Sequence, residues 1–212
     1  MRLHSAEAVP LIAAASAPDG PAETWRQARA LKTLEAELIW AHRLGWGLVA
    51  VLALVIGGFL AGTAVALMAD DSVGGGVALG LVGLAPLAVG GWLGWKVRVA
   101  GKSLVDAYCR WARASKDSTA DPASIYPRLL SGRGLLRGAI SAGAVICAAF
   151  AWSLFGLGLA TSDPAELGTG QGFGVVFGLV CGVTFTAVAC LVFGGDLRTG
   201  LAHSSRVVAG RR

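Results

Sequence analysis

Residues 45–69 read GWGLVAVLALVIGGFLAGTAVALMA, an unbroken apolar stretch without Asp, Glu, Lys, Arg or His. Three more stretches of this kind follow, at residues 73–95, 139–160 and 172–193. A helix rises about 1.5 Å per residue and the hydrocarbon core of a bilayer is about 30 Å thick, so each stretch is long enough to cross it. The sequence therefore predicts an all-α, polytopic membrane protein with four transmembrane helices.

The composition of the whole chain agrees with this fold class. Of the 212 residues, 55% are hydrophobic and only 15% are charged. A soluble globular protein carries about 25% charged residues, so an ordinary soluble domain is disfavoured. The N-terminal segment, residues 1–17, has a lone basic residue and a short apolar part interrupted by Glu7. It lacks the pattern of a cleaved signal peptide and is expected to remain as a cytosolic tail.

The basic residues define an orientation in the membrane. All 18 Lys and Arg residues lie in residues 1–44, 96–138 and 194–212, which would share one side, whereas the two short connecting turns contain none. The positive-inside rule makes that side the cytoplasm, with both termini inside. Since topology alone explains the high sequence pI of about 9.4, the basic balance is no sign of nucleic-acid binding.

The segments next to the apolar stretches are expected to form amphipathic cytoplasmic helices. One helix should run from Pro21 to about His42. In the segment after residue 95, Leu104, Tyr108 and Trp111 share one face, the pattern of a helix lying at headgroup level. The candidate contacts for anionic lipid or an acidic partner are Arg98, Lys102, Arg110, Arg113, Arg133 and Arg137. The alternative is that these residues only fix the topology.

The chain contains an internal similarity. Residues 74–82 (GGGVALGLV) and 172–180 (GFGVVFGLV) are identical at six of nine positions, at an offset of 98. Each half also has the same plan of two apolar stretches, residues 45–95 and residues 139–193. This predicts two tandem helical hairpins related by a parallel repeat. The alternative is a chance match between two glycine-rich apolar sequences.

Glycine is the main signal inside the apolar stretches. Residues four apart lie on one face of a helix, and glycine lets another backbone approach that face closely. The predicted helix-packing residues are Gly58, Gly62, Gly76, Gly80, Gly90, Gly94, Gly174, Gly178 and Gly182. The spacing leaves open whether the contacts lie within one chain or between chains.

A proline interrupts the second apolar stretch near its middle. Pro86 is expected to kink that helix and to free one backbone carbonyl. The internal similarity places Thr184 opposite Pro86, with Thr186 close by. These three residues are a candidate midplane site, although no ionisable group accompanies them. A purely structural kink is the alternative.

The residues needed for catalysis or cofactor binding do not form a motif. The three histidines and four cysteines show neither metal-ligand spacing nor a disulfide framework. None of the four apolar stretches holds an acid, a base or a histidine that could move a proton or ion. We therefore expect no enzyme, no cofactor and no metal.

Two classes of function remain after this exclusion. The first is a non-catalytic subunit or scaffold of a membrane complex for assembly, secretion or transport, whose partners are anionic lipids and other membrane proteins or further copies of the chain. The second is a small homo-oligomeric pore or holin-like permeabilising protein, with a carrier for a neutral or apolar molecule as a related alternative. The absence of Asn and the excess of Arg over Lys suggest a bacterial source, and hence the inner membrane.

Overall fold

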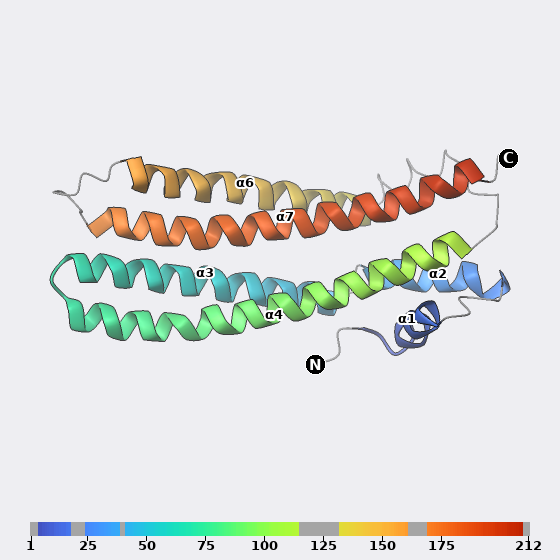
Figure 1. Cartoon of the computed structure of the whole chain (residues 1–212), viewed down its shortest axis with the longest axis horizontal. Coiled ribbons are helices and arrows are strands. Elements are labelled where there is room, and N and C mark those ends of the chain that lie inside the picture. Colours follow the sequence, from blue (N-terminus) through green and yellow to red (C-terminus); the bar gives the residue numbers. More distant parts are fainter. Residues whose placement is uncertain (1–3, 18–23, 39–40, 115–131, 161–168, 210–212) are drawn as a thin grey trace. The chain divides into compact units, whose positions relative to one another are not determined.

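The structure is a computed structural model that describes residues 4–17, 24–38, 41–114, 132–160 and 169–209. Throughout these ranges the regular structure is helical, which confirms the predicted all-α class (Figure 1). The helices are α1 (Ala8–Ser16), α2 (Thr24–Leu38), α3 (Ala41–Ala69), α4 (Val73–Ala114), α6 (Gly132–Ala160) and α7 (Thr169–Ala209).

Four of these helices are long and apolar enough to cross a membrane. Their candidate spans are Arg43–Ala69, Val73–Ala112, Gly138–Ala160 and Gln171–Gly195. They contain the four apolar stretches predicted from the sequence, and the main difference in bounds is the longer second span. The prediction of a multi-pass membrane protein is confirmed to this extent.

The chain divides into two compact units, which are described separately. The spanning unit consists of Trp46–Trp95 and Ile140–Cys190. The flanking unit consists of Met1–Gly45, Lys96–Ala139 and Leu191–Arg212. The spanning unit therefore holds most of each apolar stretch, and the flanking unit holds α1, α2 and the basic segments.

The helices of the spanning unit form an open layer. Close contacts join α4 to α3 at Gly90, α3 to α7 at Gly58, and α7 to α6 at Gly178. Figure 1 shows the same order, α6, α7, α3, α4, so that α4 and α6 lie at opposite edges. Large apolar side chains of all four helices are exposed in this arrangement.

The turn between α3 and α4 is short. Asp71 has a φ of +59°, in the left-handed region that Asp tolerates better than most residues. The N–H of Ser72 donates to the carbonyl of Leu67 at 3.1 Å, and the N–H of Gly76 donates to the carbonyl of Ser72 at 2.9 Å. These bonds satisfy backbone groups at the two helix ends and make α3 and α4 an antiparallel hairpin.

Burial in the spanning unit follows residue size. The buried apolar residues are mostly alanines, whereas many large apolar side chains are exposed. Buried examples are Ala50, Ala64, Ala144, Ala148 and Ala151; exposed examples are Leu52, Ile56, Leu81, Ile146, Phe150 and Leu157. This distribution suits helices surrounded by lipid, because lipid tails solvate large apolar side chains while small residues let helices pack closely.

The flanking unit has an apolar core of its own. Leu34 of α2 and Leu104 and Trp111 of α4 are buried in one cluster. Leu11 of α1 packs against this cluster, and its carbonyl accepts a hydrogen bond from Trp111 Nε1 at 3.0 Å. The large side chains therefore hold α1 and α2 against the second half of α4.

Residues 96–114 are helical, as the sequence predicts, and their place at headgroup level stays a prediction. These residues continue α4 without a break, since no glycine pair or proline interrupts them. Leu104, Tyr108 and Trp111 do share a face, but α1 and α2 cover it. The pattern alone could not show what covers this face, because an apolar face is satisfied equally by lipid and by other helices.

Candidate functional site

Two of the predicted glycines lie at the α3–α4 contact. A Cβ atom added at Gly76 would lie 2.8 Å from the carbonyl oxygen of Ala64, and one added at Gly90 would lie 3.0 Å from that of Ala50. A real side chain would therefore push the two backbones apart at either position. Gly94, one turn beyond Gly90, would meet nothing within 4 Å.

The contact between α3 and α7 involves Gly58 and Gly62 of α3. An added Cβ at Gly58 would lie 2.9 Å from Val180 Cγ1, and one at Gly62 would lie 3.2 Å from the carbonyl oxygen of Phe173. Phe173 also makes an edge-to-face contact with Phe59, with ring centroids 5.5 Å apart. The missing side chains on α3 thus leave room for aromatic residues of α7.

The tightest approach in the second hairpin is at Gly178 of α7. A Cβ there would lie 2.6 Å from the backbone nitrogen of Phe155 and 2.8 Å from the carbonyl oxygen of Ala151. Gly182, one turn further, would place its Cβ 3.0 Å from the indole ring of Trp152. At Gly178 the obstacle is the α6 backbone, which cannot turn aside as a side chain can.

The glycines matched by the offset of 98 differ in their surroundings. Gly76 is tight against α3, whereas its match Gly174 would bring a Cβ no closer than 3.6 Å to the carbonyl oxygen of Leu154. Gly80 is equally loose, whereas its match Gly178 is tight. The close approach is therefore displaced by one helical turn between the hairpins, and the duplication stays a prediction.

Other close approaches involve glycines that the sequence analysis did not select. A Cβ at Gly57 would lie 2.9 Å from the backbone nitrogen of Leu87, and one at Gly158 would lie 3.1 Å from that of Val175. A seven-residue spacing could have revealed the α3–α4 contact. It connects Ala50, Gly57 and Ala64 on α3, and Gly76, Gly83 and Gly90 on α4.

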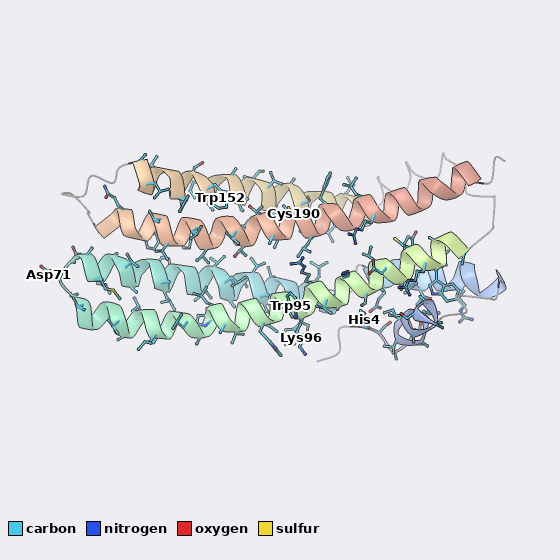
Figure 2. The ribbon with its side chains drawn as sticks, viewed as in Figure 1. His4, Asp71, Trp95, Lys96, Trp152 and Cys190 are labelled. Atoms are coloured by element: carbon cyan, nitrogen blue, oxygen red, sulfur yellow. The ribbon has the colours of Figure 1, made fainter. Side chains whose placement is uncertain are left out.

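The candidate midplane residues lie on two different hairpins. Pro86 lies inside α4, which continues on both sides of it. The hydroxyl of Thr184 donates to the carbonyl of Val180 at 2.7 Å within α7, and Trp152 Nε1 donates to Thr186 Oγ1 at 3.1 Å. The two threonines are thus engaged within the α6–α7 hairpin, where the structure brings Trp152 (Figure 2) to Thr186.

The candidate lipid-binding residues on α4 are exposed. Arg98, Lys102 and Arg110 all reach solvent in the structure, and Arg110 Nη1 also donates to the carbonyl of Ala15 at 2.9 Å. The side chains of the other three candidates, Arg113, Arg133 and Arg137, lie outside the described residues. Arg110 therefore has a structural role in holding the end of α1.

Two further polar contacts join α4 to α7 in the flanking unit. Arg198 Nη1 lies 3.9 Å from Asp106 Oδ1, and Cys109 Sγ donates to the carbonyl of Arg198 at 3.8 Å. Both charged side chains are well exposed, so the ion pair adds little stability.

A third polar contact links the N-terminal segment to α2. The backbone N–H of Ser5 donates to Glu37 Oε1 at 2.8 Å, and Glu37 is buried. Burial and the nearby Arg43 lower the pKa of His4 from 6.5, against a smaller opposing effect of Glu37. The neutral form of His4 is therefore favoured over the protonated form. The sequence gives no sign of this cluster, because its members lie far apart along the chain.

No residue set in the described part of the chain resembles a metal site. Within those residues, no three His, Cys, Asp or Glu side chains gather closely enough to hold a metal ion. The cysteines Cys109, Cys147, Cys181 and Cys190 are free thiols. The features of the described residues that bear on function are the glycine contacts between helices and the exposed basic side chains of α4.

Comparison with known proteins adds no relative. No protein-family model, curated protein or solved structure matches the chain. The most distinctive features of the described residues are the exposed glycines of α4 and α6 and the exposed basic residues of α4.

Proposed function

We propose that this chain is a non-catalytic subunit or scaffold of a membrane complex in the inner membrane of a bacterium. On this proposal both termini are cytoplasmic, and the spanning unit packs against other membrane proteins through helices at its edges. The flanking unit then lies on the cytoplasmic side, where its basic residues meet anionic lipid or a partner.

The observation that carries the proposal is the open layer of four helices. Its edge helices α4 and α6 have exposed glycines at which an added Cβ would meet no heavy atom within 4 Å, namely Gly91, Gly143 and Gly156. Other glycines face a neighbouring helix of the same chain and lie against its backbone, as Gly90 of α4 does against α3 and Gly178 of α7 does against α6. Glycine on an outer face offers the same close approach to a helix from another protein.

The hydroxyl groups favour a subunit over a pore. A water-filled path needs polar groups along its lining. Thr63 and Ser153 instead donate to the carbonyls four residues earlier in their own helices, Phe59 and Ala149, each at 2.9 Å. Thr184 does the same. The protons of these three hydroxyls are therefore used within their own helices.

Purification of the tagged full chain from its native host tests the proposal. Mild detergent, mass spectrometry of the co-purifying proteins and the intact mass of the particle should give a stoichiometric partner. A homogeneous homo-oligomer would instead favour a pore, and a lone monomer would favour the carrier; either result contradicts the subunit role.

Two matched variants would locate the partner. Gly91→Leu on α4 and Gly143→Leu on α6 each add a large side chain where nothing lies within 4 Å, so the chain itself should still fold. We expect one of them to lose the partner while the other retains it, which identifies the docking edge. Retention of the partner by both variants would refute edge docking.

The proposed orientation has its own test. A cytoplasm-dependent reporter fused after Arg212 should be active, and the same reporter inserted after Asp71 in the α3–α4 turn should be inactive. A periplasm-dependent reporter should give the reverse pattern. Activity of the periplasmic reporter at Arg212 would overturn the orientation.

A further inference from the structure

Two helices of the spanning unit share a short motif. Residues 58–62 of α3 read GFLAG and residues 149–153 of α6 read AFAWS. Each segment has a small residue, a phenylalanine one position later, and a second small residue four positions after the first. We call Gly58, Phe59 and Gly62 the α3 motif, and Ala149, Phe150 and Ser153 the α6 motif. The two small residues of each motif lie on one side of their helix, because residues four apart share a face.

The α3 motif is a binding surface for α7 within the spanning unit. Phe173 of α7 lies over Gly62, where its ring and backbone occupy the space of a side chain. Phe59 meets the rings of Phe173 and Phe177 edge-to-face, with centroids 5.5 Å and 6.2 Å away. The two rings of α7 stack on each other, with centroids 5.2 Å apart. The α3 motif thus binds a helix that carries two aromatic side chains four residues apart.

The two motifs have the same place relative to the contacts within their own hairpins. One residue before the α3 motif, an added Cβ at Gly57 would lie 2.9 Å from the backbone nitrogen of Leu87 in α4. One residue before the α6 motif, Ala148 is buried. The carbonyl oxygen of Ala151 lies 2.8 Å from the position of a Cβ at Gly178 of α7. Each motif therefore begins one residue beyond the side of its helix that packs within the hairpin.

The α6 motif is exposed along its length. Phe150 is 66% exposed, and Ala149 and Ser153 are also exposed. The hydroxyl of Ser153 donates to the carbonyl of Ala149 at 2.9 Å, so its proton is used within α6. Three residues further on, an added Cβ at Gly156 would meet no heavy atom within 4 Å. This side of α6 offers a second helix the same small residues and exposed ring that the α3 motif offers to α7.

We propose that the α6 motif binds a transmembrane helix of the partner protein, and that this helix presents two aromatic side chains four residues apart. One ring lies over the small residues, and both rings meet Phe150 edge-to-face, as the rings of α7 meet Phe59. Small residues let the partner helix approach closely, and edge-to-face aromatic pairs add to that contact. The inference rests on the proposed subunit role, because it names the chemistry of the partner and assigns it to α6.

Binding of a probe helix to the purified full chain tests the proposal. The probe is a fluorescently labelled synthetic peptide of residues 171–195, the span of α7 that fits the α3 motif, added in bicelles. We expect saturable binding. In Ala149→Leu the half-saturating mole fraction should rise about tenfold or more, because leucine fills the space for the ring. Cys147→Leu adds bulk at an exposed position on the opposite side of α6 and should change it by no more than about twofold.

The aromatic requirement has a separate test with a second peptide. The probe with Phe173→Leu and Phe177→Leu should bind the natural chain about threefold to tenfold more weakly than the unchanged probe. This difference should disappear in Phe150→Ala, because the ring that meets both aromatic side chains is then missing. Equal binding of the two peptides by the natural chain would refute the proposed chemistry of the partner. A difference that persists in Phe150→Ala would refute the role of Phe150.

The outcomes separate this inference from the subunit role. Absence of saturable peptide binding, or an equal loss in Ala149→Leu and Cys147→Leu, refutes the α6 motif even if a stoichiometric partner co-purifies with the natural chain. Specific peptide binding by a chain that purifies from its host as a lone monomer would refute the subunit role alone. Where a native partner co-purifies, Ala149→Leu should lose it and Cys147→Leu should keep it. Retention by Ala149→Leu contradicts the proposal, and so does a homogeneous oligomer of the natural chain that Ala149→Leu dissociates.

Discussion

The two units bury opposite kinds of residue. In the flanking unit the buried side chains include Leu34, Leu104, Tyr108 and Trp111, while basic residues are exposed. In the spanning unit the buried residues are mainly alanines and glycines, and leucine, isoleucine and phenylalanine side chains are exposed. The same chain therefore follows two packing rules.

The difference follows from the surrounding medium. In water, burying large apolar side chains is the main favourable contribution to folding. In a bilayer, the tails are as apolar as leucine, so helices associate through close van der Waals contact between small residues instead. The residue sizes thus agree with a lipid environment for the spanning unit.

The largest expected effect is on the flanking unit. Trp111→Ala removes a side chain that is only 4% exposed, together with the hydrogen bond to Leu11. Comparable substitutions cost about 3–5 kcal/mol. Hydrogen exchange should show that α1 and the middle of α2 lose protection.

An exposed residue in the same unit provides the control for that change. Leu197→Ala on α7 should leave the protection of α1 and α2 as it was. If Trp111→Ala also leaves it as it was, the large side chains do not hold the flanking unit together and the contrast between the units is wrong.

The next largest effect is expected in the spanning unit, where a larger residue should destabilise. Gly178→Ala places a Cβ against the backbone of Phe155 and Ala151, and overpacking of this kind costs about 1–3 kcal/mol. Unfolding in mixed micelles, titrated with sodium dodecyl sulfate, would measure the loss. Gly143→Ala, in open space on α6, is the matched control and should be neutral or stabilising. Equal stability of both variants would show that α6 and α7 do not approach as closely as described.

The four spans could be predicted because each depends only on local composition. A charge-free apolar run needs no knowledge of its neighbours to be identified as a span. The continuity of α4 was harder to predict, because the change from Trp95 to Lys96 marks a boundary in polarity without any residue that ends a helix. The cluster of α1, α2 and α4 could not be foreseen, since its contacts join positions as distant as Leu11 and Trp111.

The candidate site was less predictable than the fold for a related reason. The spacing of small residues identifies the positions at which another helix can approach. Which of these positions it contacts depends on how the neighbouring helix is shifted along its own axis. Gly90 and Gly94 share one pattern in the sequence, yet only Gly90 lies against a backbone. The contact of Ser5 with Glu37 has no sequence signature at all, because the donor is a backbone N–H.

A smaller effect, confined to the flanking unit, is expected from pH. Because the pKa of His4 is lowered by burial and by Arg43 of α3, the folded chain binds this proton less tightly than the unfolded chain, whose pKa is near 6.5. The stability that the folded chain gains from this lowered pKa is present above about pH 6.5. It is lost as the pH falls from there through the pKa of His4 in the folded chain. Glu37 of α2 opposes the shift.

Hydrogen exchange of residues 5–9 at about pH 7.5 and about pH 5.5, corrected for intrinsic rates, would measure this loss. In His4→Asn the protection should no longer depend on pH over this interval. Persistence of the full dependence in that variant would assign the titration to another group.

The smallest effect is expected where the spanning unit exposes a large residue. Leu157 on α6 is 67% exposed, so Leu157→Ala removes contacts with detergent or lipid and few with protein. The change in unfolding free energy in mixed micelles should stay within about 0.5 kcal/mol. A loss comparable with that of Gly178→Ala would mean that another helix covers Leu157 in the purified particle. Large residues as well as glycines would then contribute to helix packing on this side of α6, and the contrast between the two units would be weaker than their exposed fractions indicate.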